Sequence, residues 1–161
     1  MKLTFLGTGG GRINLVDQIM HTGGFRIDSK SANIHIDPGP GALIHSLNKK
    51  LNPKELDAVI VSHYHLDHCS DASVLIEAMT GYTFKKRGIF IGSKFTVEGD
   101  SKGDRSVSAY HMNLPEKVYS AEFGERKKFQ TEKGSFEIEI IKIYLNSSIY
   151  LIIIKVIYKN Y

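Results

Sequence analysis

The chain has a single cysteine, so it cannot form a disulfide within itself, and nothing in its cysteine content argues for an oxidising compartment. It also has no uninterrupted apolar run of about 20 residues, the length needed to cross a bilayer. The short apolar start before Gly7 lacks the longer apolar core and the cleavage site of a signal peptide. We therefore expect a cytoplasmic protein that does not enter a membrane.

Most of the chain has almost no net charge. The net charge is +4, but residues 141–161 hold three lysines and no acidic residue, which leaves +1 for residues 1–140. A nucleic-acid-binding module usually has a strong basic surface, so this balance disfavours one. The basic clusters at 85–87 and 126–128 could contact phosphate groups of a nucleic acid. The alternative interpretation is that they are turn residues exposed to solvent.

Glycines are concentrated after the first apolar segment, at Gly7 and at residues 9–11. Such a backbone can turn tightly and approach a ligand closely. A dinucleotide-binding loop would need glycine where Arg12 stands, and the lysine followed by serine or threonine of a phosphate-binding loop is missing. The loop therefore matches neither nucleotide motif.

The 161 residues, 42% of them hydrophobic, predict one compact domain with strands and helices alternating early and strands dominating late. Turn residues such as those at 38–41 separate several of the expected elements, and Ser70 is expected to cap a helix that Gly81 ends. We expect strands at 2–6, 33–37, 57–62, 88–92 and 134–144, helices from 42 and over 70–81, and a loop over 93–109. The strand at 134–144 is expected to pair with the segment around 128–129.

The end of the chain differs in composition from the rest. Residues 141–161 contain seven isoleucines and four tyrosines, with no Gly, Pro, Asp or Glu. Such a segment is either a buried strand or a site of aggregation. Eighteen of these 21 residues are Ile, Lys, Asn, Tyr or Leu, which codons of A and T alone can encode, so a shifted reading frame and an AT-rich gene both explain it. We divide the chain into a domain over 1–145 and a biased tail over 146–161.

Three histidines and an aspartate form the pattern His-x-His-x-Asp-His at His63, His65, Asp67 and His68. Imidazole and carboxylate are ligands that zinc prefers, and a two-residue spacing in an extended segment sends His63 and His65 to the same side. Four buried polar side chains without a metal would each need another partner. The pattern therefore predicts a site for one or two divalent ions, with zinc the expected metal.

This pattern, with "LTFLGTGGG", "HTGG", "HIDPGPGAL" and "VIVSHYHLDH" in order along the chain, resembles the metallo-β-lactamase superfamily. The similarity is greatest to archaeal predicted metal-dependent hydrolases in the branch of ribonuclease Z and the cyclic phosphodiesterases. It implies an αββα sandwich, an α/β fold, with the metals at one edge. His63 and His65 would bind the first metal, and Asp67, the expected catalytic residue, and His68 the second. A bridging hydroxide would then attack a phosphodiester or a small phosphorylated substrate.

The resemblance breaks down toward the end of the chain. Family members complete the site with a third histidine, a bridging aspartate and a last histidine, and Leu145 stands where the third histidine is expected. No aspartate or histidine follows. We therefore expect a sandwich that is incomplete in its second half and exposes an apolar face, and a homo-oligomer that covers this face. The alternative function is a truncated or frame-shifted remnant that binds metal but is inactive alone, or that needs a second chain.

Five further residues are candidate participants in the site. His111 is a candidate substitute ligand or a surface histidine, whereas His21 and His35 suit supporting or structural roles. Asp37 can either accept a hydrogen bond from a ligating imidazole or form a turn. Cys69, beside His68 near a helix start, would have a lowered pKa there, but a small helix-start residue is the preferred interpretation.

Overall fold

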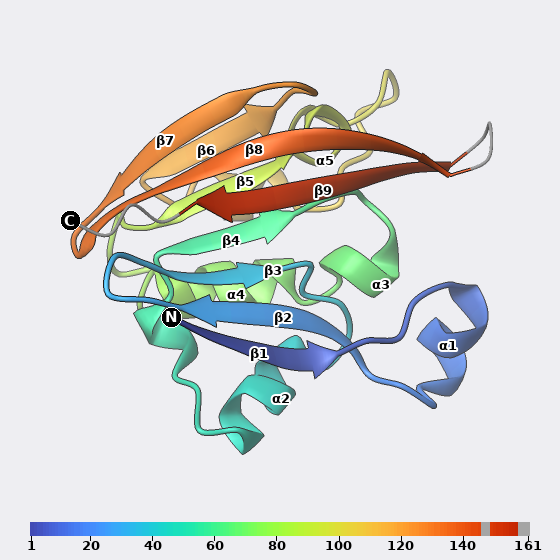
Figure 1. Cartoon of the computed structure of the whole chain (residues 1–161), viewed down its shortest axis with the longest axis horizontal. Helices are drawn as coiled ribbons and strands as arrows, with labels where there is room; N and C mark the ends of the chain where they lie inside the picture. Colours follow the sequence, from blue (N-terminus) through green and yellow to red (C-terminus); the bar gives the residue numbers. More distant parts are fainter. Residues whose placement is uncertain (146–148, 158–161) are drawn as a thin grey trace.

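The structure, a computed structural model, describes residues 1–145 and 149–157, with side chains described for residues 1–141. Two stacked β-sheets and a layer of helices make up these residues (Figure 1). The larger sheet has the order β1-β2-β3-β4-β5-β6 and the smaller the order β7-β8-β9. The described part of the chain thus has three of the four layers of an αββα sandwich, and the expected α/β class is confirmed.

The nine strands are β1 (Lys2–Gly7), β2 (Thr22–Asp28), β3 (Asn33–Ile36), β4 (Ala58–Val61), β5 (Ile89–Ser93), β6 (Lys117–Ala121), β7 (Arg126–Thr131), β8 (Gly134–Leu145) and β9 (Ile149–Ile157). The helices are α1 (Arg12–Asp17), α2 (Ala42–Asn48), α3 (Leu66–Cys69), α4 (Ala72–Met79), α5 (Lys94–Glu98) and α6 (Ala109–Met112), with one 3₁₀ turn, η1 (Pro53–Glu55). None of the described helices is long and apolar enough to cross a membrane.

The direction of the strands decides where side chains from distant segments meet. Strands β1, β2 and β3 pair antiparallel, whereas β3, β4, β5 and β6 pair parallel. The carboxyl ends of β3, β4 and β5 therefore lie at one edge of the larger sheet. Ligands of open parallel sheets bind at this edge, so the residues that follow these strands are the natural candidates for a site.

Two apolar cores hold the layers together. Strand β4 is buried at all four positions, as its unbroken Ala-Val-Ile-Val sequence predicts for a central parallel strand. Ile60 and Ile91 face Phe136 and Ile138 of the smaller sheet, whereas Val59 faces the helices on the opposite side. Alternate residues of each central strand thus contribute to different cores, which is why both faces of the sheet are covered.

The smaller sheet is two-sided over its described side chains. Phe136, Ile138 and Ile140 are buried against the larger sheet, as the alternating sequence predicts. On the other face, Lys128 lies opposite Glu137, whose carboxylate accepts a hydrogen bond from Arg126. Opposite charges in such cross-strand pairs suit contact with water. The outer face of β7 and of the first part of β8 is therefore charged and not apolar. The expected homo-oligomer stays a prediction.

Most expected elements are present, and the differences have clear causes. Strands β2 and β6 and helix α1 were not expected, because Gly23 and Gly24 interrupt β2 and the segments are short. Within the expected loop at 93–109, residues 94–98 form α5 instead, capped by the Ser93 hydroxyl. The expected cap at Ser70 is wrong, since its hydroxyl donates backward to the Leu66 carbonyl.

The boundary between the expected domain and tail lies partly outside the described residues, because 146–148 and 158–161 are not among them. Residues 149–157 form β9 and pair antiparallel with β8, with Leu145 opposite Ile149. The strand interpretation of this segment therefore agrees with the backbone. The division into 1–145 and 146–161 stays a prediction.

Candidate metal centre

The four side chains of the His-x-His-x-Asp-His pattern lie at the carboxyl edge of the larger sheet. They follow β4 and continue into α3, a single turn whose first residue follows His65. Asp37 stands directly after the neighbouring parallel strand β3, so it lies at the same edge. Its backbone has a φ of 52°, a left-handed conformation that aspartate tolerates better than most residues.

The donors approach one another in two pairs. Nε2 of His63 lies 3.1 Å from Nδ1 of His65, and Nε2 of His68 lies 3.5 Å from Oδ2 of Asp67. Two ligands of a tetrahedral zinc are about 3.3 Å apart, given bonds of about 2.0–2.1 Å. Both separations are close to this value, so each pair has the spacing of two ligands on one ion. The rings of His63 and His68 are 4.1 Å apart between centroids, which brings the two pairs together.

Hydrogen bonds behind the imidazoles determine which nitrogens face forward. The Ser62 hydroxyl donates to Oδ2 of Asp37 at 2.7 Å, and the Ser62 amide donates to Oδ1 at 2.7 Å. Because that hydroxyl has only one proton, its contact of 3.0 Å with Nδ1 of His63 requires the proton on Nδ1. The lone pair of His63 is then on Nε2, the nitrogen that faces His65. Asp37 thus orients His63 through Ser62.

His68 is oriented by the same carboxylate. Its Nδ1 lies 3.0 Å from Oδ2 of Asp37, which is close enough for an ion pair although the approach lacks the alignment of a hydrogen bond. A proton on Nδ1 is favoured by this carboxylate and leaves the lone pair on Nε2, beside Asp67. Carboxylates behind ligating histidines fix the ring tautomer in this way in metal sites.

The glycine-rich first loop reaches the centre from the other side. The Gly11 amide donates to Oδ2 of Asp67 at 2.8 Å, across 56 residues of sequence. Burial alone would raise the pKa of Asp67, but this hydrogen bond and the nearby His68 outweigh it and lower the pKa. Asp67 is therefore a carboxylate at neutral pH, the form that binds metals.

The two partly buried imidazoles, His63 and His68, differ in their affinity for protons. Burial, reinforced by His68, lowers the pKa of His63 to about 4, so His63 is neutral at pH 7. Burial also acts to lower the pKa of His68, but the contact with Asp37 overcomes it and raises the pKa above the ordinary value. A cation at His68 would therefore compete with a proton, whereas His63 already has the neutral form that ligates.

The close fit between α3 and the turn after β3 depends on Gly39. A Cβ at Gly39 would collide with the carbonyl oxygens of Asp67 and Thr22. The Pro38 carbonyl also accepts a hydrogen bond from the Asp71 amide at 2.9 Å, which ties the turn to the start of α4. The Pro-Gly-Pro-Gly sequence therefore allows two backbone segments to approach and holds Asp67 near Asp37.

Comparisons with known proteins assign the chain to a family. The family described as "Beta-lactamase superfamily domain" matches residues 32–150. The chain belongs to the metallo-β-lactamase superfamily. It is 42% identical over 118 residues to an uncharacterised protein of Methanocaldococcus jannaschii, covering 73% of this chain and 44% of that protein. It is 27% identical over 164 residues to a ribonuclease Z of an Exiguobacterium species, covering 88% of this chain and 54% of that enzyme.

A solved structure supports the same fold. The metallo-β-lactamase fold protein YhfI of Bacillus subtilis superposes with a TM-score of 0.61 at 22% identity, covering 96% of this chain and 56% of that one. At this identity the likeness shows the fold alone. The chain spans about half the length of the curated relatives that it matches.

The resemblance to the metallo-β-lactamase superfamily implies that further donors complete the site in family members, and the sequence predicts that this chain lacks them. Among residues 1–141, whose side chains are described, no three His, Cys, Asp or Glu side chains are grouped so that they could hold one ion. The described residues thus offer two donors to each of two ions. Neither pair by itself completes the coordination of an ion. The side chain of Leu145, where the third histidine was expected, lies outside the described ones.

The remaining histidines have partners elsewhere in this metallo-β-lactamase domain. Nε2 of His111 lies 3.1 Å from Glu77, and its Nδ1 lies 2.8 Å from the Ser108 hydroxyl, so a helix-to-helix contact explains it. The ring of His21 lies against that of His45, with centroids 4.0 Å apart. The structure does not bring His111 or His21 into either donor pair.

His35 is a structural residue, and its burial makes folding depend on pH. The ring is fully buried, Nε2 lies 2.9 Å from the Gly23 carbonyl, and burial lowers its pKa from 6.5 to about 4. Because the unfolded chain binds this proton more readily, the stabilisation is complete above pH 6.5 and is lost as the pH falls toward 4. The shift corresponds to about 3 kcal/mol.

Urea unfolding of the metal-free protein at pH 7 and at pH 4.5 measures this dependence. We expect the free energy of unfolding to fall more steeply toward low pH for the wild-type chain than for His35→Gln, whose amide can still donate to Gly23 but does not titrate. Identical slopes for the two proteins would contradict the assignment.

Cys69 is inert in the folded protein, contrary to the lowered pKa that its helix-start position would give. It is 3% exposed, its sulfur donates to the Tyr64 carbonyl at 3.3 Å, and burial raises its pKa to about 11. The thiolate is the reactive form, so reaction at pH 8 requires unfolding. A thiol reagent should leave the native chain unlabelled and label one site in 6 M guanidinium. Rapid labelling of the native chain would contradict this.

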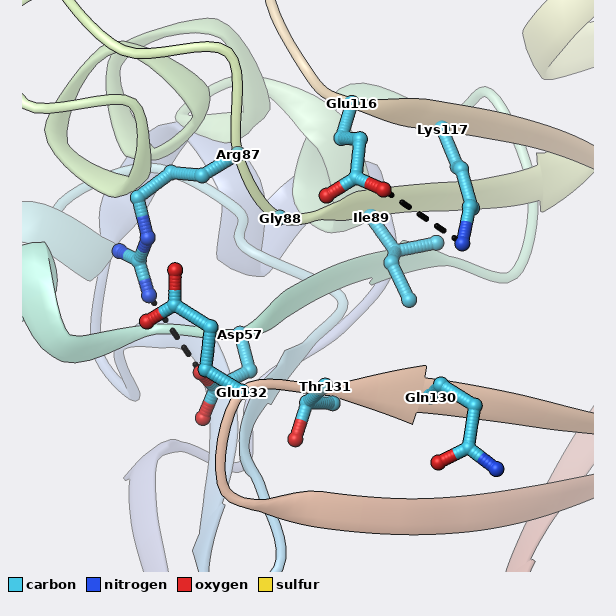
Figure 2. Close-up of a pocket in the computed structure, with 9 residues that line it drawn as sticks. All are labelled: Asp57, Arg87, Gly88, Ile89, Glu116, Lys117, Gln130, Thr131 and Glu132. Atoms are coloured by element: carbon cyan, nitrogen blue, oxygen red, sulfur yellow. Dashed lines mark hydrogen bonds and ion pairs between the residues drawn. The ribbon is translucent and has the colours of Figure 1, made fainter.

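A hollow lies at the opposite edge of the larger sheet, at the amino ends of β4, β5 and β6 (Figure 2). Asp57, which is 3% exposed, lines this hollow. Its carboxylate accepts hydrogen bonds from Lys133 at 2.8 Å, from the backbone N–H of Asn33 at 2.8 Å and from Arg87 at 3.4 Å. The carboxylate is thus satisfied by groups that tie the two sheets together. This edge has a structural role.

Two participants in the centre were not singled out from the sequence. Ser62 was included only as the end of the expected strand, and Gly11 only as part of a loop able to approach a ligand. The position of Ser62, directly before the first histidine, is a signal that could have identified it. Gly11 offered no such signal, because every residue except proline has a backbone N–H.

Proposed function

We propose that this chain is a metal-dependent hydrolase of the metallo-β-lactamase superfamily that cleaves a phosphodiester or a small phosphorylated substrate. The observation that carries the proposal is the separation of 3.1 Å between Nε2 of His63 and Nδ1 of His65. Without a metal, two imidazoles so close have only one hydrogen bond to share. A divalent ion can instead accept a lone pair from each.

In this proposal His63 and His65 hold one ion, and Asp67 and His68 hold a second, with zinc the expected metal. When bound, the metal supplies water activation, because it can lower the pKa of a bound water to about 7. Asp37 and Ser62 keep the lone pairs of His63 and His68 directed forward. The Gly11 amide keeps Asp67 ionised, which suits its proposed catalytic role as a group that orients water and accepts a proton.

The choice of a phosphorus ester as substrate is supported by the relative named ribonuclease Z, since a ribonuclease cleaves phosphodiesters. Assembly into a homo-oligomer and a cytoplasmic location are also part of the proposal. Contact with nucleic acid stays open and is disfavoured by the low net charge of residues 1–140.

The experiment measures metal content and activity on the same sample. After purification without added metal, zinc per chain is determined by mass spectrometry, and the chain is then incubated with bis-p-nitrophenyl phosphate. We expect zinc-dependent release of p-nitrophenol that a chelator abolishes and added zinc restores, and loss of release in Asp67→Asn. A folded chain that holds zinc and leaves the ester intact would contradict hydrolysis.

A second candidate is a chain that binds metal but needs donors from another chain to act, or is inactive alone. The observation in its favour is that the described side chains form donor pairs and no group of three. Near two zinc ions per chain in the same measurement would favour the hydrolase. Near zero would favour a chain whose missing donors come from a second chain, and bound zinc without turnover would favour a chain that is inactive alone.

A further inference from the structure

Two aromatic side chains meet beside the candidate metal centre. Tyr64 is the third residue after β4, and Phe95 is the second residue after β5, the parallel neighbour of β4. Their ring centroids are 4.5 Å apart with 34° between the ring planes. Both residues thus belong to the sheet edge where ligands of parallel sheets bind.

Both rings remain substantially in contact with water. Tyr64 is 48% exposed and Phe95 is 39% exposed, whereas Phe90 within the same strand β5 is fully buried. Single exposed aromatic residues are common on protein surfaces, but two in mutual contact at a site edge are a feature of ligand pockets. The pair, which we call the aromatic platform, can stack a further ring.

The aromatic platform is in contact with one of the proposed metal ligands. The Tyr64 ring lies 5.2 Å from the His65 ring between centroids, at an interplanar angle of 66°. A planar group stacked on the aromatic platform would therefore lie beside His65. A phosphoryl group attached to that planar group would then be near the donor pair of His63 and His65.

We propose that Tyr64 and Phe95 form a subsite for a planar aromatic ring of the substrate, either a nucleobase or a simple aryl ester. The proposal rests on the proposed function, because it places the ring next to a phosphoryl group at the metal centre. The hydrolase would then prefer phosphorus esters that have an aromatic substituent over aliphatic ones.

The test compares ligands that differ in the ring alone and that the enzyme cannot turn over. Calorimetry on the zinc-loaded chain measures the affinities of phenylphosphonate and methylphosphonate, and of the methylenephosphonate analogues of adenosine 5′-monophosphate and ribose 5-phosphate, whose C–P bonds resist hydrolysis. Stacking on one aromatic side chain changes affinity by about 5- to 150-fold, so we expect a preference of this size for the ring-bearing member. Preference in the second pair only would identify a nucleobase, and preference in both would identify any aryl group.

Variants assign the preference to the aromatic platform. Tyr64→Ala and Phe95→Leu should each reduce the preference severalfold, whereas Tyr64→Phe, which keeps the ring and removes the hydroxyl, should retain it. Both positions are exposed, and circular dichroism verifies folding of each variant. Equal affinities within each ligand pair in the zinc-loaded wild-type chain would overturn the proposal.

Failure of the aromatic platform and failure of the metal centre give different results. Zinc bound without a ring preference removes the aromatic platform and leaves the proposed function intact. If the chain binds no zinc, the proposed function fails, and a preference for adenosine over ribose by the metal-free chain still supports the ring subsite. Sedimentation of Tyr64→Ala tests a second copy of the chain as the occupant: dissociation of an oligomer without change in ring preference would overturn the proposal.

Discussion

Replacing His63 with alanine should weaken zinc binding by more than about 100-fold. The substitution removes one of the two imidazoles whose nitrogens lie 3.1 Å apart and leaves His65 without its partner. Loss of supporting groups alone costs about 10–100-fold in metal affinity, so loss of a ligand should cost more. Competition with a zinc-sensitive chelating dye measures the dissociation constant directly, without any need for turnover.

The comparison needs a graded variant and a histidine outside the centre. Asp37→Asn keeps the shape of the group but removes the charge that faces His68, so we expect a loss of about 10–100-fold. His111→Ala removes an imidazole that pairs with Glu77 and should leave zinc affinity unchanged. If His63→Ala binds zinc as tightly as His111→Ala, the donor pair does not hold the metal.

Replacing Asp57 with alanine should cost about 3–5 kcal/mol of the free energy of unfolding, the usual result of breaking a buried ion pair on one side. The loss leaves Lys133, Arg87 and the Asn33 amide without their common acceptor. Because proteins of this size are stable by only about 5–15 kcal/mol, the loss is a large share of the total. Unfolding in urea, followed by circular dichroism, measures it.

The control residue lines the same hollow. Glu132→Gln, at an exposed position beside the Asp57 network, should change stability by less than about 0.5 kcal/mol. A double-mutant cycle of Asp57→Ala with Lys133→Met then separates the contact between the sheets from the others. A coupling of zero between the two positions would show that this ion pair does not stabilise the sandwich.

The sequence predicted the parts of the fold that depend on local pattern. Strand β4 was recognised from four consecutive apolar residues, and β8 from the alternation of Phe136, Ile138 and Ile140 with glutamates. Strand β2 was missed because glycines have neither strand propensity nor an apolar side chain, and its pairing with β1 and β3 is what orders it. Tertiary hydrogen bonding thus overrode a weak local preference.

The candidate centre was predictable to the same extent. The spacing of His63 and His65 indicated a pair, because alternate residues of an extended segment face the same side, and their side chains do meet. The partners that orient the ligands come from far away in the sequence: Asp37 is 25 residues before Ser62, and Gly11 is 56 residues before Asp67. No local pattern relates such positions.

By itself, the sequence determined the superfamily, and it identified the candidate donors and their spacing along the chain. The tertiary structure alone decided which nitrogen of His63 faces forward, that Asp67 stays ionised, and that Cys69 is unreactive. The physical reason is that ligand type and two-residue periodicity are local properties of a chain. Burial, ring tautomer and pKa depend instead on neighbours that only parallel strands ending at one edge can bring together.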